Sequence, residues 1–507
     1  MVTMITKAIQ LILISLLVFT PIAFGSMDFW TFSLMELAIL FIMILWALQF
    51  GIVGYKLRSR NPETETPDSE LRIPNSSLRT PILVLLAIFL CLILFQMTPL
   101  PAGMMKVLSP KSDALRHYLL EGFNLRPYYS LSLVPFATQV EFFKWLTLIG
   151  FFLFLQYGSF SGKKGGRLSP LVLAIFLVGV FESLYGMFES FSGHNQALNI
   201  KLDDSSVAGT FISRNYFAGY LLMVIPLSIG YLLSRRESQI LRFGGWRHWL
   251  TSLHGKSLLI GFGVIVMILS LLFSASRMGI ISLLFSCGLI SLLTRSLYGG
   301  RKVSKIPILI LVLALLWAAW IGLDAVIGRF FTSSEDFNPR WKVWVDTFRI
   351  LRDFPLLGSG LGTFTQVFPM YRSFHTNGLA THAENDFLQL ASEVGLIGMG
   401  LLLILFLSLF YKAVAGIRSL SRGDPSRYIG IGGLVGISGL LFHSLVEANI
   451  QIPANAFLYT FIFGLVLRLP AIHGEGGHHG SIPYERINDH FRFEGSDRYV
   501  RLNRQDG

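Results

Sequence analysis

Two arginines and an asparagine border long apolar segments of this sequence, where a charged side chain is costly and therefore informative. Arg214 and Asn215 lie in GTFISRNYFAGYL, directly before an apolar segment, and Arg277 lies in SASRMG, a short stretch between two others. A charge within hydrocarbon costs at least about 2.5 kcal/mol. A guanidinium group also matches the oxygens of a phosphate in a bidentate manner. These residues therefore predict a binding site for a phosphate or pyrophosphate.

A third polar group occurs later, in THAENDFLQLASEVGLIG, where His382, Glu384 and Asn385 precede an apolar segment. An imidazole, or a carboxylate partly removed from water, can take a proton from a hydroxyl near neutral pH. We expect His382 or Glu384 to act as a general base. Asn385 would either bind substrate or cap the helix that follows.

The composition indicates which elements must position these side chains. Of the 507 residues, 52% are hydrophobic and only 14% are charged, against about 25% charged in ordinary globular chains. Twelve apolar segments are long enough to span a bilayer. These are Ala8–Gly25, Phe32–Tyr55, Pro81–Thr98, Gln139–Phe160, Pro170–Glu189, Arg214–Leu233, Ser257–Ala275, Gly279–Arg295, Ile306–Ile327, Asn385–Tyr411, Tyr428–Val446 and Asn455–Leu469. We therefore predict an all-α, polytopic integral membrane protein with about twelve transmembrane helices.

The charge distribution orients these spans. With the N-terminus inside, the cytoplasmic segments hold about twice as many Lys and Arg residues as the outer ones, as the positive-inside rule requires. The net charge of +12 is then topological and does not indicate a nucleic-acid partner. Both termini should be cytoplasmic, and the three polar groups then share the outer side. Cys91 and Cys287 lie within apolar segments, which excludes a disulfide framework or a cysteine metal site.

The chain divides into four parts. Residues 1–80 form a transmembrane hairpin and a cytoplasmic loop, and residues 81–208 form further spans with a first long outer loop. Residues 209–469 contain the polar groups and a second outer loop, 328–384. Residues 470–507 are a polar, cytoplasmic tail that we expect to be disordered. Its His473, His478 and His479 could bind a metal, but the Gly- and His-rich composition favours a flexible linker.

The second outer loop carries a helical pattern. Its apolar residues recur at helical spacing at Trp341, Trp344, Val345, Phe348 and Leu351, with basic residues such as Arg340 around them. This pattern predicts an amphipathic helix at the outer interface. The helix would either seat a lipid-linked substrate or act as a packed lid.

The remaining polar patterns carry weaker predictions. Three glycines, Gly358, Gly360 and Gly362, indicate a tight turn, because no strand–loop–helix context supports a nucleotide loop. Glu141 and Lys144 are three residues apart and should neutralise each other. Glu182 and Glu189 share one helical face and could line a polar cavity, which is the observation that favours a transporter or flippase.

The polar motifs together resemble the superfamily of O-antigen ligases and Wzy-type O-antigen polymerases. The resemblance spans residues 209–469 and rests on GTFISRNYFAGYL, SASRMG, RWKVWVDTFRILRDFPLLGSGLGTF and HAENDFLQL. It implies an inverting glycosyltransferase of the bacterial inner membrane that moves a glycan from undecaprenyl pyrophosphate to an acceptor hydroxyl at the periplasmic face. No nucleotide sugar or metal cofactor is implied. The acceptor is lipid A-core in ligases and another lipid-linked repeat unit in polymerases.

The resemblance also implies roles for single residues. Arg214 and Arg277 would bind the pyrophosphate, and Arg340 would contact donor phosphate or sugar. Many members carry histidine directly before the asparagine of the last motif, whereas this chain has Glu384 there and His382 two residues earlier. We expect His382 to be the base, with Glu384 as its orienting partner or substitute. A ligase is favoured over a polymerase, and a transporter or flippase is the alternative from another class.

Overall fold

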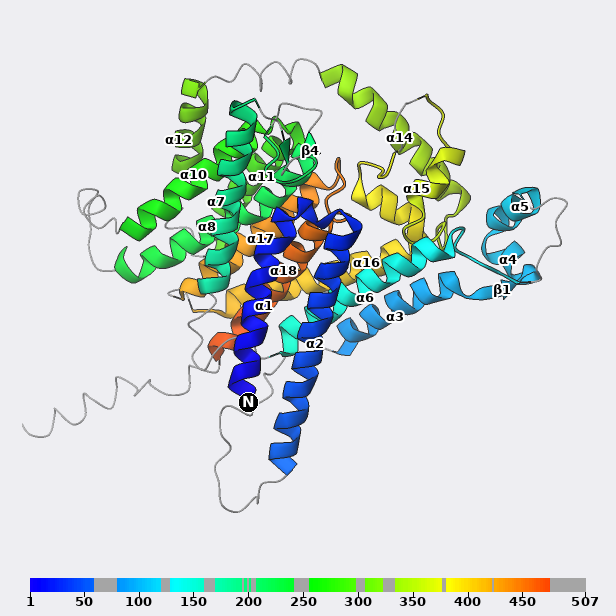
Figure 1. The fold of residues 1–507 in the computed structure, drawn as a ribbon, viewed down its shortest axis with the longest axis horizontal. Helices are drawn as coiled ribbons and strands as arrows, with labels where there is room; N and C mark the ends of the chain where they lie inside the picture. The colour runs from blue at the N-terminus through cyan, green and yellow to red at the C-terminus, as the bar shows by residue number, and fades with distance from the viewer. Residues whose placement is uncertain are drawn as a thin grey trace, which may run out of the picture.

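The fold is known from a computed structural model and consists almost entirely of helices (Figure 1). The structure describes residues 1–58, 80–119, 128–158, 169–193, 196–197, 200–201, 207–240, 255–297, 306–321, 333–375, 380–421 and 424–474. Most of the tail therefore lies outside the described residues, and so does the end of the segment predicted over Ile306–Ile327.

Each of the twelve predicted spans coincides with a helix. The helices are α1 (Val2–Ile22), α2 (Phe29–Arg58), α3 (Thr80–Met97), α6 (Pro135–Tyr157), α7 (Ser169–Phe191), α8 (Arg214–Ile240), α10 (Gly255–Phe273), α11 (Arg277–Leu297), α12 (Ile306–Ile321), α16 (Asp386–Ser419), α17 (Pro425–His443) and α18 (Pro453–Gly474). Ten of those described are long and apolar enough to cross a membrane. The other two are α12, described over 16 residues, and α17, whose glycines lower its hydropathy. The expected twelve crossings are thus supported for ten.

Shorter elements connect the spans. They are η1 (Phe24–Ser26), β1 (Pro99–Pro101), α4 (Ala102–Leu108), α5 (Pro110–Leu119), β2 (Tyr128–Ser130), β3 (Gln196–Ala197), β4 (Ile200–Lys201), α14 (Ser333–Asp353), α15 (Phe364–Val367) and η3 (Phe368–Met370). Strand β1 pairs antiparallel with β2, and β3 pairs antiparallel with β4. The helix predicted around Trp341 and Phe348 is α14, which has 21 residues.

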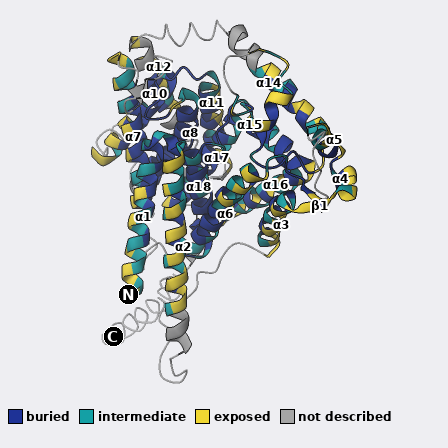
Figure 2. Ribbon diagram, turned by 45° about the vertical axis from the view of Figure 1, so that its right-hand side comes forward, coloured by how far each residue is buried: buried dark blue, intermediate teal, exposed yellow. Residues whose placement is uncertain are grey.

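Helices α8 and α17 form the centre of the bundle, where Figure 2 shows them buried among the other helices. Their backbones approach closely because glycines face each other. A Cβ atom on Gly432 would lie 2.4 Å from the carbonyl oxygen of Pro226, and one on Gly436 would lie 2.8 Å from that of Met223. Such small-residue contacts are a main source of helix association within membranes. The packing of this helix pair therefore fixes the position of the N-terminal end of α8 relative to the loop after α17.

Replacing Gly432 with alanine should destabilise the protein by about 1–3 kcal/mol, because the new methyl group meets immovable backbone atoms and the helices must separate. Gly288 on α11 is the matched control, since a Cβ atom there has nothing within 4 Å. Thermal unfolding in detergent should show a lower midpoint for Gly432→Ala and an unchanged or slightly higher one for Gly288→Ala. Equal midpoints would contradict the proposed close packing.

Candidate active site

The loop that carries His382 and Glu384 is held by a small core of its own beside the bundle. This core contains buried Val343 and Ile350 from α14, Phe364 and Phe368 from the α15–η3 segment, and Ala383. The backbone N–H of Ala383 also donates to Oε1 of Gln389, at 3.0 Å. Ala383 thus fixes the positions of the two titratable residues on either side of it.

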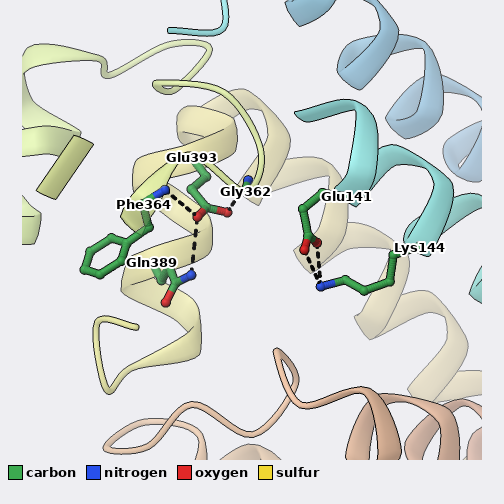
Figure 3. Close-up of polar contacts among 6 residues, drawn as sticks. All are labelled: Glu141, Lys144, Gly362, Phe364, Gln389 and Glu393. Carbon is green, nitrogen blue, oxygen red and sulfur yellow. Dashed lines mark hydrogen bonds and ion pairs between the residues drawn. The ribbon is translucent and has the colours of Figure 1, made fainter. Parts of the chain in front are cut away.

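Gln389 connects this loop to the glycine-rich turn (Figure 3). Its Nε2 donates to Oε1 of Glu393 at 3.3 Å, and Glu393 also accepts from the backbone N–H groups of Gly362 and Phe364, at 2.9 and 3.2 Å. The expected tight turn is confirmed, because Gly358, Gly360 and Gly362 all have positive φ angles.

The turn packs into a break in α16. Gly395 has a φ of 69° and a ψ of −179°, so the helix is interrupted there. The carbonyl groups of Ser392 and Glu393 accept hydrogen bonds from the N–H groups of Ser359 and Gly360, both at 3.0 Å. Irregular backbone near a bilayer must find such partners within the protein. The break therefore fixes the position of the glycine-rich turn. Through Gln389 it also fixes the loop that carries His382 and Glu384.

His382 faces a separate polar group on α6. Glu141 and Lys144 form the predicted self-neutralising pair, with Nζ 2.6 Å from Oε1 (Figure 3). Burial, together with the positive charge of Lys144, lowers the pKa of His382 from 6.5 to about 4. Its Nδ1 is buried without a hydrogen-bond partner. His382 is therefore a neutral imidazole at physiological pH.

Glu384 belongs to a different cluster, which joins three distant parts of the chain. The carboxyl group of Glu447, in the turn between α17 and α18, interacts with the side chain of Glu384 and lies 2.5 Å from Nη2 of Arg340 on α14. Trp344, one helical turn after Arg340, donates from Nε1 to the carbonyl oxygen of Glu384 at 3.2 Å. Glu384 itself has a φ of 52°. Such a conformation is uncommon for a residue with a side chain and recurs at functional sites.

The start of α8 borders this cluster. Tyr216, next to Asn215, lies within electrostatic reach of Glu384, Glu447 and Arg340. A Cβ atom on Gly219 would lie 2.0 Å from Oδ1 of Asn449, two residues after Glu447. Arg214 is the first residue of α8, and both it and Asn215 are half-buried. The first polar motif therefore lies beside the Glu384 cluster.

A buried carboxylate fixes the turn that precedes Arg214. Glu182 on α7 accepts from the backbone N–H of Thr210 at 2.8 Å and lies 2.8 Å from its hydroxyl oxygen. The same hydroxyl oxygen lies 2.8 Å from the carbonyl oxygen of Pro21. Glu182 thus serves the turn before α8, which weakens its use as a sign of a transport cavity.

Arg277 begins α11 at the same end of α8. Gly279 contacts the neighbouring helix so closely that an added Cβ atom would lie 2.9 Å from Cβ of Ala218. Ala275, two residues before Arg277, has a φ of 51°. The second motif therefore contains a strained residue, as the third does, and its arginine starts a helix that packs beside Tyr216. N-terminal helix ends favour anions, because their N–H groups are unpaired and their dipole is positive.

The two candidate bases thus have different surroundings in the structure. Glu384 lies with Arg340, near the helix starts that carry Arg214 and Arg277, whereas the described contacts of His382 are with Gln389 and Lys144. Asn385 caps α16, since its Oδ1 accepts from the N–H of Leu388 at 2.9 Å. On α14, Trp341 and Phe348 of the predicted stripe are exposed, as suits a helix at the membrane surface.

Residues 262–403 match the family model of the O-antigen ligase (Wzy_C). This match supports the resemblance to the O-antigen ligase superfamily over that stretch. The match includes Arg277, Arg340, His382 and Glu384 and excludes Arg214. It supports O-antigen ligase- or polymerase-type glycan processing by a multi-pass bacterial membrane protein. No curated protein matches the chain.

Sequence analysis missed three residues of the site as functional candidates. Glu447 is not among the predicted site residues, although a glutamate directly after a span, in HSLVEAN, is itself a signal of function in a membrane protein. Tyr216 is adjacent to the arginine motif, and Gln389 lies one helical turn beyond Asn385. No sequence spacing indicates that Glu447 contacts Arg340, because that contact depends on the packing of α14 against α16, whose Asp386 holds the turn of Glu447.

Proposed function

We propose that this protein is an inverting glycosyltransferase that moves a glycan from undecaprenyl pyrophosphate to an acceptor hydroxyl at the periplasmic face of the inner membrane. The observation that carries the proposal is the convergence of two helix starts bearing arginines with the cluster of Arg340, Glu384 and Glu447. A basic site beside a carboxylate can hold a pyrophosphate and take a proton at the same time.

The chemistry follows from this arrangement. The acceptor oxygen attacks the anomeric carbon and forms the new C–O bond, while the bond from that carbon to the pyrophosphate oxygen breaks. The leaving pyrophosphate keeps the bonding electrons, and Arg214 and Arg277 stabilise its charge. The acceptor's proton passes to the base. Preorganised cations at the developing charge are usually the largest contribution to such a reaction.

We assign the role of base to Glu384, with His382 as the earlier candidate. Glu384 lies in the cluster with Arg340 and beside the start of α8, whereas the groups that act on His382 are Lys144 and Gln389. The match to the O-antigen ligase family favours a ligase, whose acceptor is lipid A-core. A polymerase would use the same donor site with a second lipid-linked repeat as the acceptor.

The pH dependence of the rate tests whether His382 is neutral at physiological pH. His382 has a pKa lowered to about 4, so it loses its proton well below the usual value of 6.5 and stays neutral between pH 5.5 and 8. The ratio of kcat/KM for His382→Gln to that for the wild type should therefore be constant over this pH range. A decline of wild-type kcat/KM near pH 6.5 that His382→Gln removes would show that His382 titrates in catalysis.

The experiment that tests the function itself is product analysis. The purified protein in liposomes would receive an undecaprenyl-pyrophosphate-linked oligosaccharide and, in separate reactions, lipid A-core or a second lipid-linked repeat. A ligase forms a glycosidic bond only to lipid A-core, and a polymerase only to the second repeat. The absence of any new glycosidic bond with both acceptors would overturn the proposal.

A further inference from the structure

We propose that Glu447 is a positioning residue of this site: as a neutral carboxylic acid it accepts a hydrogen bond from Arg340 and donates one to the carboxylate of Glu384. This inference rests on the proposed function and adds a residue outside the matched family stretch, which ends at residue 403.

The geometry places Glu447 between the two other groups. Its Oε1 lies 2.5 Å from Nη2 of Arg340, and its carboxyl group also interacts with the side chain of Glu384. An arginine can only donate, and an ionised carboxylate can only accept. A single carboxyl group can satisfy both neighbours at once only if it carries a proton, with its carbonyl oxygen towards Arg340 and its hydroxyl towards Glu384.

Burial decides which of the two carboxyl groups holds the proton. The side chain of Glu447 is 2% exposed, whereas Glu384 is half-buried. Two ionised carboxylates that interact in a site of low polarity repel each other, which is costly. Burial raises the pKa of Glu447 well above its usual range; Arg340 opposes this effect, and the Glu384 carboxylate adds to it.

Other polar and titratable groups pack around the cluster. Asp386, at the start of α16, accepts from the N–H groups of Asn449 and Ile450 at 2.8 Å and so fixes the turn that carries Glu447. His443, at the end of α17, lies near Arg340, with its Nδ1 3.1 Å from Nδ2 of Asn449. Tyr216 from α8 borders the carboxyl groups.

A neutral Glu447 has a direct consequence for the base. It orients Glu384 without adding a second negative charge beside an anionic donor, and it leaves Glu384 free to accept the acceptor's proton. An ionised Glu447 would instead repel the pyrophosphate and compete with it for Arg340. The protonated form therefore suits a site that must bind an anion.

The test uses glutamine as a mimic of the protonated acid. The Oε1 atom of glutamine can accept from Arg340 while its amide donates to Glu384, so Glu447→Gln should keep kcat within about fivefold of the wild type. Glu447→Ala removes both hydrogen bonds and should lower kcat by about 100-fold, as a misplaced catalytic group does. Glu189→Gln on α7 controls for loss of a half-buried glutamate outside the site.

If Glu447→Gln is as impaired as Glu447→Ala although it elutes as a folded protein, Arg340 needs an anion and the proposal is overturned. Wild-type rates in both variants would overturn it equally. A second measurement is independent of activity and of the stability of Glu447→Ala. The infrared difference spectrum at pH 7 between the wild type and Glu447→Gln should contain the C=O band of a protonated carboxyl group, and carboxylate bands alone would refute it. If the wild type itself forms no glycosidic bond, it is the proposed function that fails.

Discussion

Replacing Arg277 with alanine will lower kcat for glycan transfer by about 1,000-fold, because a cation fixed at the leaving pyrophosphate is lost from the transition state. Arg277 is the first residue of α11 and starts beside Ala218 on α8, close to the Glu384 cluster. Arg277→Lys keeps the charge without the bidentate fork and should fall between alanine and the wild type. Steady-state rates with the lipid-linked donor check both values.

Arg295 provides the matched control for this variant. It lies in the last turn of the same helix and is exposed, so Arg295→Ala removes the same side chain from the opposite end of α11. Its kcat should equal that of the wild type. A folded Arg277→Ala protein with wild-type kcat would remove Arg277 from the pyrophosphate site.

Glu384→Gln should lower kcat by about 100- to 10,000-fold, the usual contribution of a general base. The substitution keeps the shape of the side chain and its backbone contact with Trp344, so the loss reports the carboxylate itself. His382→Gln should lose less activity, since its imidazole faces Lys144. Rates for both variants at saturating donor would measure the difference.

The opposite ranking would reassign the base. If His382→Gln abolished transfer while Glu384→Gln stayed within about twofold of the wild type, the role of general base would be assigned to His382. Circular dichroism and gel filtration of both variants would exclude misfolding as the cause of either loss.

The spans could be predicted from sequence because each contains about 20 apolar residues, a signal that no tertiary contact can hide. The pairing of Glu141 with Lys144 could be predicted for the same local reason, since residues three apart on a helix are neighbours. The turn at Gly358 and Gly360 also followed from local backbone requirements. The structure confirms the pair and the turn, and ten of the predicted spans are helices long and apolar enough to cross a membrane.

The arrangement of the site could not be predicted in the same way. Arg340 and Glu447 are about 100 residues apart, and they meet because α14 packs against α16, whose Asp386 holds the turn that carries Glu447. The break at Gly395 could not be predicted, because the segment around it is continuously apolar. The break depends on the glycine-rich turn, whose N–H groups donate to the carbonyl groups of Ser392 and Glu393. The division of His382 and Glu384 between two clusters depends on Ala383, whose burial between them no sequence pattern indicates.

The most direct test of the central claim is a single-turnover reaction in liposomes with a donor that is labelled in its sugar and in its lipid. We predict that the sugar label appears on the acceptor in a new glycosidic bond and that undecaprenyl pyrophosphate is released in equal amount. The Arg277→Ala protein should leave the donor intact. Movement of the intact labelled donor across the bilayer without a new bond would contradict the account and would favour a flippase.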